Sequence, residues 1–326
     1  MDIIKVGIIG CGWFGNVHLD NLLKIDGVEV TALTSSNIVK LKKTGEKAPK
    51  ANLYSNHKEM YEKENLDAVF ICVPPDSHGD AEILAAQKGI HMYVEKPIEV
   101  SVQKAKTIEA EIKKAGVISS VGYQERYNEE MNKIKAYLSN KKVGLVTARW
   151  LGGIPGAPWW RRKERSGGQI VEQSTHLFDT LRYLFGEAES VFCLGRKGLV
   201  ENIPDYNLED YSVATISFKS GVLATVETAC YLDDIKHFNG AGFRIVCEDE
   251  VIECDWNNEF RYITNDSIRK VSVTESSHLK AVEEFINSVR TGDSHGIKST
   301  YSDAVKTFEL TMASNESIKS QSPQQV

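Results

Sequence analysis

Three glycines near the amino terminus restrict the fold of this chain more than any other feature. Gly10, Gly12 and Gly15 come directly after a short apolar run at residues 6–9, and a helical pattern of apolar residues follows at 15–23. Glycines at this spacing, between a first strand and a first helix, are typical of the turn that opens a βαβ unit. The segment therefore predicts a parallel α/β domain at the start of the chain.

Each glycine has a physical role in such a turn. Gly10 permits the tight bend, Gly12 leaves room for a pyrophosphate, and Gly15 lets the helix pack closely on the strand. The first N–H groups of the helix then point at the phosphate charge. We therefore predict a dinucleotide site that also includes Trp13 and Phe14, which stand between the second and third glycines. A glycine turn without a ligand is the alternative.

Strand-like and helix-like segments continue to alternate up to residue 122. We predict strands at 28–33, 68–73, 91–94 and 117–121, and helices at 80–88 and 102–115. Alternation of this kind implies a parallel sheet with helices on both faces. Residues 1–122 are therefore predicted to form a Rossmann dinucleotide-binding domain.

The pattern changes after residue 122 to strands that often alternate apolar and polar positions. We predict strands at 145–150, 190–194, 211–218, 223–231, 242–247, 251–255 and 261–263, and helices at 173–185, 279–290 and 302–314. Residues 317–326 are polar, and we expect them to fray. Residues 123–326 are therefore predicted to form an α+β domain with an open, mainly antiparallel sheet, which carries the catalytic and oligomerisation surfaces.

The composition argues against two classes of partner. A net charge of −6 in 326 residues argues against nucleic acid, because phosphate binding needs a concentrated basic face. No apolar stretch reaches the ~18 residues of a membrane helix, and the amino terminus has the pattern of a strand instead of a signal peptide. The six cysteines lack the spacing of a zinc site. We expect a cytoplasmic protein without a metal.

The end of the second strand bears on the choice between NAD and NADP. No acidic residue stands there to bind the ribose 2′-hydroxyl of NAD. Ser35 and Ser36 are donors that suit a 2′-phosphate, and Lys40, Lys42 and Lys43 lie close in sequence. This arrangement favours NADP. NAD is the alternative, in which the lysines are only the solvated face of a helix.

Three motifs resemble those of one protein family. They are Pro-Pro-x-x-His at 74–78, Glu-Lys-Pro at 95–97 and the run Val-Gly-Tyr-Gln-Glu-Arg-Tyr-Asn at 121–128. Their order and spacing, over residues 3–315, resemble the glucose-fructose oxidoreductase, inositol dehydrogenase and rhizopine-catabolism (Gfo/Idh/MocA) family. The resemblance implies an NAD(P)-dependent oxidoreductase that moves hydride between nicotinamide and a secondary alcohol or ketone of a sugar, inositol or related polyol. It also implies a homodimer or homotetramer.

A lysine at the end of a parallel strand stands where ligands bind in open α/β sheets. The ammonium of Lys96 suits stabilisation of a developing alkoxide and contact with the nicotinamide ribose. The resemblance implies that Lys96 is catalytic and that the peptide before Pro97 is cis. We also expect cofactor contacts from Val73, Pro74, His78, Glu95, Lys96 and Gln124.

The second half of the predicted site follows Gly167 and Gly168. If the segment is helical, Glu172, His176 and Asp179 fall on one face. A histidine with a pKa near ~6.5 suits proton exchange with an alcohol, and an acid one turn earlier suits orientation or relay. The resemblance implies that His176 is the catalytic acid and base, with Glu172 in place of the usual aspartate. The alternatives are a core histidine paired with Glu172, or a metal bound by the three side chains.

Substrate contacts are predicted from three further places. The loop before Gly167 offers Trp159 and Trp160 as an apolar wall, with Arg161 or its neighbour available for an anionic or hydroxylated group. Tyr123 stands at the domain junction, where we expect substrate to meet the nicotinamide in the cleft. The full predicted substrate set is Lys96, Tyr123, Trp159, Trp160, Arg161, His176 and Asp179.

Two other functions remain compatible with this sequence. One is a glycoside hydrolase of the same fold, which keeps its NAD bound and cleaves by transient oxidation and elimination. The other is a non-catalytic NADP(H) sensor that controls a partner protein. Lys96 and His176 argue against the sensor, because a sensor needs neither side chain.

Overall fold

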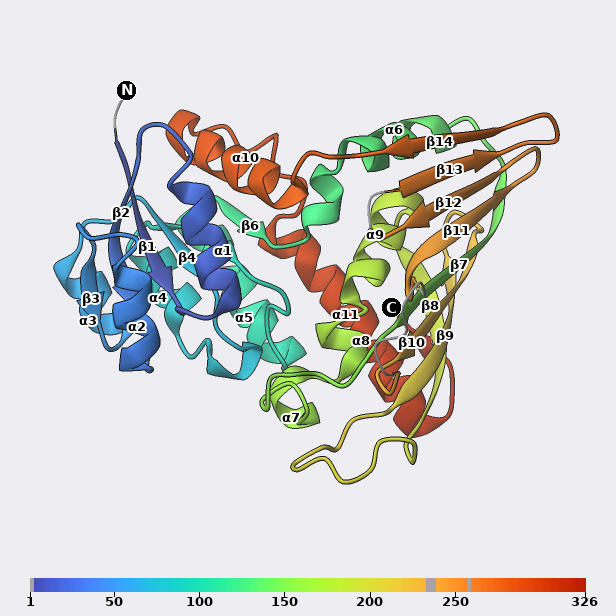
Figure 1. Ribbon diagram of the computed structural model, residues 1–326, viewed down its shortest axis with the longest axis horizontal. Helices are drawn as coiled ribbons and strands as arrows, with labels where there is room; N and C mark the ends of the chain where they lie inside the picture. Colours follow the sequence, from blue (N-terminus) through green and yellow to red (C-terminus); the bar gives the residue numbers. More distant parts are fainter. Residues whose placement is uncertain (1–2, 233–238, 257–258) are drawn as a thin grey trace. The chain divides into compact units, whose positions relative to one another are not determined.

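The computed structural model describes residues 3–232, 239–256 and 259–326 (Figure 1). The chain divides into two compact units, Met1–Gln124 with Ser277–Val305, and Glu125–Ser276 with Lys306–Val326. The first break lies near the predicted boundary at residue 122. The return of residues 277–305 to the first unit is a feature that no local pattern in the sequence indicates.

The first unit contains a six-stranded parallel sheet in the order β3-β2-β1-β4-β5-β6. Its strands are β1 (Ile4–Ile9), β2 (Val28–Thr34), β3 (Asn52–Tyr54), β4 (Ala68–Ile71), β5 (His91–Val94) and β6 (Ser119–Val121). Every residue of β4 is buried, as expected of a central parallel strand covered on both faces. This arrangement confirms the predicted Rossmann-type domain.

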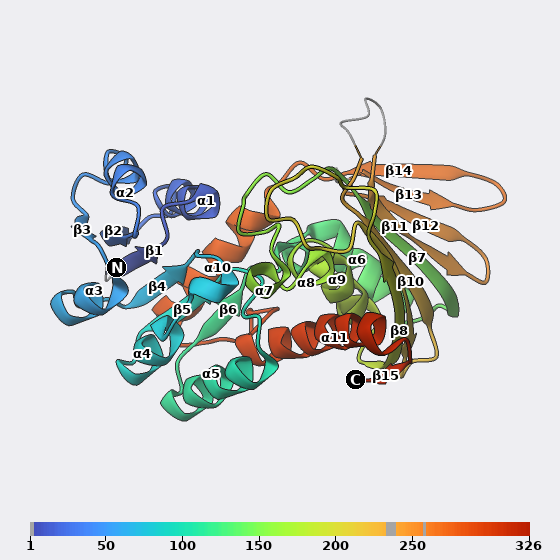
Figure 2. The ribbon, with the colours of Figure 1, turned by 90° about the horizontal axis from the view of Figure 1, so that it is seen from below.

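Helices cover both faces of this sheet. They are α1 (Trp13–Leu22), α2 (Ile38–Gly45), α3 (His57–Lys63), α4 (Ala81–Gln87), α5 (Val102–Ala115) and α10 (Ser277–Thr291). Figure 2 shows α1 and α2 on one face, and α3, α4 and α5 on the other. Helix α10 packs beside α1, and its buried Phe285 contacts the rings of Phe70 and Tyr93 at centroid distances of 5.5 and 5.7 Å. Apolar burial thus draws a distant segment onto the first sheet.

The second unit contains a nine-stranded sheet in the order β14-β13-β12-β11-β7-β10-β9-β8-β15. Its strands are β7 (Val143–Leu151), β8 (Ala188–Arg196), β9 (Tyr211–Phe218), β10 (Leu223–Ala229), β11 (Ala241–Cys247), β12 (Val251–Asp255), β13 (Glu259–Ile263), β14 (Ile268–Ser272) and β15 (Gln324–Gln325). Only β7 and β10 pair in parallel among these described strands. The predicted open and mainly antiparallel sheet is therefore confirmed.

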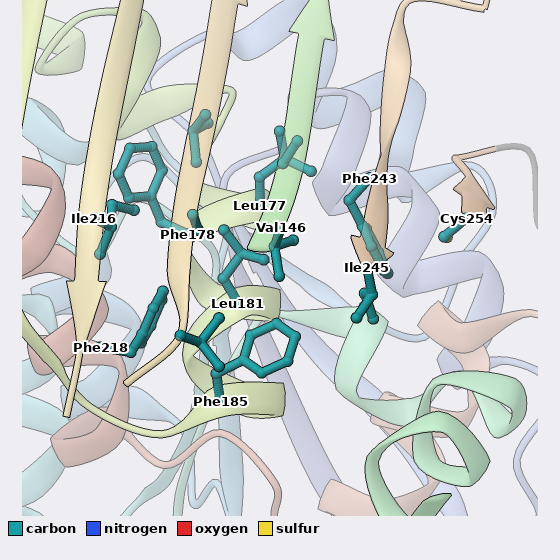
Figure 3. Close-up of a cluster of buried hydrophobic side chains, with 14 of the residues drawn as sticks. Val146, Leu177, Phe178, Leu181, Phe185, Ile216, Phe218, Phe243, Ile245 and Cys254 are labelled. Carbon is teal, nitrogen blue, oxygen red and sulfur yellow. The ribbon is translucent and has the colours of Figure 1, made fainter. Parts of the chain in front are cut away.

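Only one face of the second sheet is covered by helices. These are α6 (Glu129–Leu138), α7 (Lys163–Ser166), α8 (Gln169–Glu172), α9 (Thr175–Phe185) and the larger part of α11 (Tyr301–Ser320). Leu177, Phe178 and Leu181 of α9 are fully buried against Val146 and Ile216 of the sheet (Figure 3). Alternate residues of β9 are exposed on the opposite face. One-sided burial explains the alternating patterns found in the sequence.

Three predictions of secondary structure need correction. The predicted helix at 173–185 is interrupted, because Ser174 N donates to Gln169 O at 2.9 Å and α9 begins only at Thr175. The predicted frayed tail is ordered: α11 runs to Ser320 and β15 pairs with β8. Finally, α2, α3, β3 and β14 lie in segments for which no element was predicted, since these elements are short and largely polar.

Candidate functional site

The glycine turn between β1 and α1 has the close contacts that its sequence predicts. Gly10 has a φ of +102°, and a Cβ there would lie 2.4 Å from the carbonyl oxygen of Cys72. A Cβ on Gly15 would lie 1.8 Å from Gly10 O, whereas one on Gly12 would meet nothing within 4 Å. Gly12 is the N-cap of α1 and has no side chain to satisfy the first N–H groups. The turn therefore fits a pyrophosphate over Gly12, and α1 supplies donors for it.

Trp13 and Phe14 differ in their surroundings. Trp13 is 77% exposed, and its ring centroid lies 4.7 Å from that of Phe14. Phe14 in turn stacks on His278, in the first turn of α10, with a centroid distance of 6.1 Å. Burial lowers the pKa of His278, and the charges of His18 and Lys96 act in the same direction, while Glu95 opposes them. The stacked imidazole is therefore predominantly neutral at neutral pH. No local signal in the sequence indicated His278.

The end of β2 is a turn closed by side chains. Ser35 Oγ accepts a hydrogen bond from Asn37 N at 3.2 Å, and Asn37 caps α2 by accepting from Lys40 N at 3.0 Å. Ser36 is exposed, as are the lysines of α2 at 40, 42 and 43. The exposed donors next to β2 are therefore Ser36 and these lysines, while Ser35 helps to shape the turn.

The segment after β4 is held by a buried histidine. Val73 and Pro74 lead into the short 3-10 helix Pro75–Ser77. His78 Nε2 lies 3.2 Å from Val73 O, and His78 Nδ1 is hydrogen-bonded to Glu82. Burial lowers the pKa of His78, but the carboxylate of Glu82 outweighs this effect, so that the pKa is raised. Since both ring nitrogens are engaged in the interior, His78 acts on the Val73 backbone, through which its predicted contact with a cofactor would run.

Lys96 follows β5 by two residues, and the Lys96–Pro97 peptide bond is cis, as the resemblance implied. Glu95, directly before it, is bonded to the buried His18 of α1, with 2.7 Å between Oε1 and Nε2. Tyr123 and Gln124 follow β6 and are buried, with 2% and 8% exposure. The structure thus places Glu95, Lys96, Tyr123 and Gln124 just beyond the carboxyl ends of neighbouring strands, where ligands bind in open α/β sheets. His18 was not predicted, because no local pattern in the sequence indicates a partner 77 residues away.

His176 lies in the first turn of α9 and is 7% exposed. Its ring stacks on Trp150, at the end of β7, with a centroid distance of 5.9 Å and an interplanar angle of 23°. Trp256 packs edge-on against Trp150 at 5.1 Å and lies 6.2 Å from His176. The imidazole of His176 therefore contacts two tryptophan rings, and neither tryptophan was predicted to be part of the site.

Glu172 is buried but ends α8, so that the break at 173–174 separates it from the helix of His176. The prediction that Glu172, His176 and Asp179 share one face required an uninterrupted helix. Asp179 does belong to α9, yet it is only 1% exposed and engaged elsewhere. The prediction of one continuous helix is therefore wrong: Glu172 lies in α8, whereas His176 and Asp179 lie in α9.

Asp179 belongs to a buried network of charges. Arg126 donates from Nε and Nη2 to the two carboxylate oxygens of Asp179 at 2.8 and 2.7 Å. Thr307 of α11 donates to Asp179 at 2.8 Å and accepts from Arg182, which also pairs with Glu187. Because both carboxylate oxygens accept from protein groups, Asp179 anchors α9 to α11. Its contact with substrate stays a prediction.

The loop that carries Trp159 and Trp160 is stabilised by contacts among its own residues. Trp159 and Trp160 stack with 6.3 Å between ring centroids. Arg161 Nε donates to Pro155 O at 2.8 Å and its Nη2 to Gly156 O at 3.4 Å, while Arg162 pairs with Glu164. These guanidinium groups hold the loop, and the contact of Arg161 with substrate stays a prediction.

Membrane-spanning helices and metal sites are both absent from the part of the chain that the structure describes. No helix in residues 3–232, 239–256 and 259–326 is long and apolar enough to cross a membrane. Over the same ranges, no group of three histidine, cysteine or acidic side chains is arranged to hold a metal ion.

Two family models match consecutive parts of the chain. The model for the oxidoreductase family with an NAD-binding Rossmann fold matches residues 4–123, and the GFO/IDH/MocA C-terminal domain matches residues 132–253. The chain belongs to the Gfo/Idh/MocA oxidoreductase family. It is therefore an enzyme of the oxidoreductase class with an NAD-binding domain, and the predicted family and reaction class are confirmed.

Relatives with assigned names agree with this placement. The chain is 27% identical to a myo-inositol 2-dehydrogenase of Thermotoga maritima, over 89% of each chain. It is 23% identical to a D-glucoside 3-dehydrogenase of Escherichia coli, over 88% of each. A structure of levoglucosan dehydrogenase with NADH and levoglucosan superposes with a TM-score of 0.89 at 18% identity, covering 100% of both chains. This last similarity shows that the two proteins share a fold.

The buried Arg126–Asp179 pair generates a prediction about stability. Arg126→Met leaves the Asp179 carboxylate buried without its cation, so we expect a loss of about 3–5 kcal/mol in the free energy of unfolding. The double variant Arg126→Met/Asp179→Leu removes both charges and should regain most of this loss. Urea denaturation measures both effects.

The matched control for this prediction is Lys133→Met. Lys133 forms an exposed ion pair with Glu129 on α6 and lies 3.6 Å from the buried Glu130, which keeps a hydrogen bond from Tyr262 without it. Its loss should change the free energy of unfolding by less than about 1 kcal/mol. Equal stabilities of the Arg126→Met and Lys133→Met variants would contradict the anchoring role of the buried pair.

Proposed function

We propose that the protein is an NAD(P)-dependent dehydrogenase of a secondary alcohol on a sugar, inositol or related polyol. The observation that carries the proposal is the imidazole of His176, held nearly buried against Trp150 and next to Trp256. Aromatic rings offer apolar surface with a polar edge, and we infer that they receive the carbon face of a ring-shaped polyol. The names of the relatives, which include inositol and glucoside dehydrogenases, support this class of substrate.

The proposed chemistry assigns one task to each side chain. His176 takes the hydroxyl proton of the alcohol, since imidazole exchanges protons near neutral pH. Glu172 orients His176 or relays its proton, and the ammonium of Lys96 stabilises the alkoxide. The nicotinamide, when bound, supplies the hydride acceptor, and the protein supplies orientation. Gly10, Gly12, Gly15 and the start of α1 would hold its pyrophosphate.

A substrate panel tests this function. Cofactor reduction would be followed by absorbance with sugars, inositols and sugar acids, using NAD and NADP in parallel. We expect reduction with at least one neutral polyol and a fall of at least ~100-fold in kcat for His176→Ala, because general acid–base catalysis contributes about 10²–10⁴-fold. Lys96→Met should lose activity similarly, while both variants still bind cofactor.

The panel also separates the two rival functions. Release of a free sugar from a glycoside without net cofactor reduction would favour the NAD-dependent hydrolase. Cofactor binding without turnover on any substrate, together with a partner whose affinity follows the redox state, would favour the NADP(H) sensor. Full activity of His176→Ala on a reactive polyol would contradict the role of His176 as general acid and base.

We propose further that the enzyme prefers NADP to NAD. Support comes from the end of β2, where Ser36 and the lysines of α2 are exposed and no acidic residue stands. We therefore expect kcat/KM to be higher with NADP. Ser36→Asp should reverse the preference by about 10-fold or more, because a carboxylate repels the 2′-phosphate and accepts from the 2′-hydroxyl. Gln103→Glu, at an exposed position of α5, is the control of equal charge change, and a wild-type preference for NAD would contradict the proposal.

We propose that the uncovered face of the second sheet joins two copies of the chain. Leu145, Leu194, Tyr211, Val213 and Leu223 lie there at exposed positions of β7, β8, β9 and β10, and each is between 38% and 50% exposed. In register, Leu223 lies beside Leu145, and Val213 beside Leu194. A contiguous apolar patch of this kind is typical of an interface.

Sedimentation velocity tests the proposed dimer. We expect the wild-type chain of 36.4 kDa to sediment as a dimer or a tetramer. Val213→Lys places a charge in the patch and should shift the population towards the monomer. Val39→Lys, at a 73% exposed position of α2, is the control. A monomeric wild-type chain at micromolar concentration would contradict this proposal.

We also propose that the protein acts in the cytoplasm. All six cysteines are free thiols, and burial raises the pKa of Cys193 to about 12 and of Cys230 to about 11. Free thiols in this number are typical of a reducing compartment. Export of the protein with its thiols intact would contradict this location.

A further inference from the structure

A buried histidine is hydrogen-bonded to the buried carboxylate of Glu95, the residue before Lys96. His18 projects from α1 and is fully buried, and its Nε2 lies 2.7 Å from Glu95 Oε1. The side chain of Glu95 is 7% exposed, and Lys96 is the next residue of the chain. Since an ionised carboxylate only accepts hydrogen bonds, the imidazole donates from Nε2. Helix α1 is thereby connected to the segment that carries the lysine.

Aromatic rings fix the orientation of His18. Its ring centroid lies 4.9 Å from that of Tyr93 and 5.2 Å from that of Phe70. Its Nδ1 is buried and has no hydrogen-bond partner among the described residues. Glu95 is therefore the group towards which the imidazole directs its donor, and the apolar surroundings leave the ring little freedom to turn.

Glu95 is also restrained by its backbone and by the residue that follows β6. Glu95 N donates to Ile71 O at 2.9 Å, which continues the pairing of β5 with β4. A Cβ on Gly122 would lie 2.7 Å from Glu95 Oε1 and 2.8 Å from Oε2. The carboxylate thus packs directly on the glycine backbone that follows β6. Both ends of the Glu95 residue are fixed, and this restricts the backbone from which the Lys96 side chain starts.

Glu95 also acts on two neighbouring titratable groups. Burial lowers the pKa of His278 in α10 and Glu95 opposes this effect, whereas burial and then the charge of Glu95 raise the pKa of the half-buried Cys72 after β4. Removing a carboxylate from water costs several kcal/mol, and an apolar pair of similar volume is often equally stable. A buried carboxylate hydrogen-bonded to an imidazole at this place is therefore poorly explained by stability alone.

We propose that His18 is a positioning residue of the reaction: its Nε2–H holds the Glu95 carboxylate and thereby fixes Lys96 for contact with the reacting oxygen. The inference rests on the proposed role of Lys96, and it assigns to α1 a second task besides phosphate binding. His18 touches neither substrate nor cofactor in this scheme. Loss of its donor leaves the glycine turn intact and displaces the lysine, and small displacements of a catalytic group are costly in rate.

Three substitutions of His18 test the proposal. In His18→Gln the amide nitrogen can take the place of Nε2, whereas the shorter amide of His18→Asn falls short of Glu95 and His18→Leu has no donor. We expect kcat on a reactive polyol to fall at least ~10-fold in the Asn and Leu variants, which corresponds to about 1.4 kcal/mol, and to recover to within ~3-fold of wild type in Gln. The dissociation constant for NADH or NADPH, measured by fluorescence, should change by less than ~3-fold in all three.

A deuterated substrate supplies a second readout. If hydride transfer slows because Lys96 is displaced, the deuterium isotope effect on kcat should rise in the Asn and Leu variants and stay near the wild-type value in Gln. His57 is the matched control, because its Nε2 lies 2.7 Å from Asp80 outside this cluster. His57→Leu should leave kcat and the isotope effect unchanged. If the Leu variant fails to fold, the comparison of Gln with Asn, which are both polar, still decides.

Two results would overturn the proposal, and both differ from a failure of the proposed function. Wild-type kcat in His18→Asn, or weaker cofactor binding with unchanged kcat, would show that the pair does not position the lysine. The same holds if Gln is as impaired as Asn. Full activity of Lys96→Met would instead remove the proposed role of Lys96, whatever the His18 variants do.

Discussion

The close approach of two backbone segments at the first turn is the constraint on which the first unit depends. A side chain at Gly15 would collide with Gly10 O at 1.8 Å, and one at Gly10 with the carbonyl oxygen of Cys72 at 2.4 Å. The start of α1 therefore lies against the ends of β1 and β4, which brings its unsatisfied N–H groups to the sheet edge where a dinucleotide binds. The same closeness places His18, one turn later, within reach of Glu95.

The second unit is organised by a different kind of interaction. Its sheet is covered on one face only, so α9 is buried on the side that meets the sheet, with Leu177, Phe178 and Leu181 in the core. Arg126, Asp179 and Thr307 then join three separate segments around the same helix. Apolar packing holds α9 against the sheet, and the charged network fixes the position of α9. His176 acquires its place against Trp150 from both effects.

Elements with a strong local pattern were predictable from the sequence. The strand at 91–94 and the helix at 102–115 have the predicted bounds, because residues 92–94 are a continuous apolar run and the helix is flanked by its caps, Ser101 and Gly116. The elements between residues 38 and 63 were missed, since they are short and their ends depend on capping by Asn37 and Asn56. The tail was also missed, because its order comes from Ser317, which accepts a hydrogen bond from Cys193 N across the fold.

Local order along the chain was enough to indicate the Rossmann turn and the two kinds of sheet, because each of these depends on neighbours within a few positions. The resemblance to a known family was needed to select Lys96 and His176 as candidate catalytic residues. The side chains that surround the site residues come from segments that are distant in the sequence, such as Trp150 beside His176. The sequence did not indicate that Arg161 donates to the carbonyl of Pro155 or that Asp179 accepts from Arg126. Buried polar groups must be satisfied wherever the folded chain brings a partner close, and sequence spacing does not contain that information. His18 with Glu95 and His278 with Phe14 are pairs of this kind, separated by 77 and 264 residues.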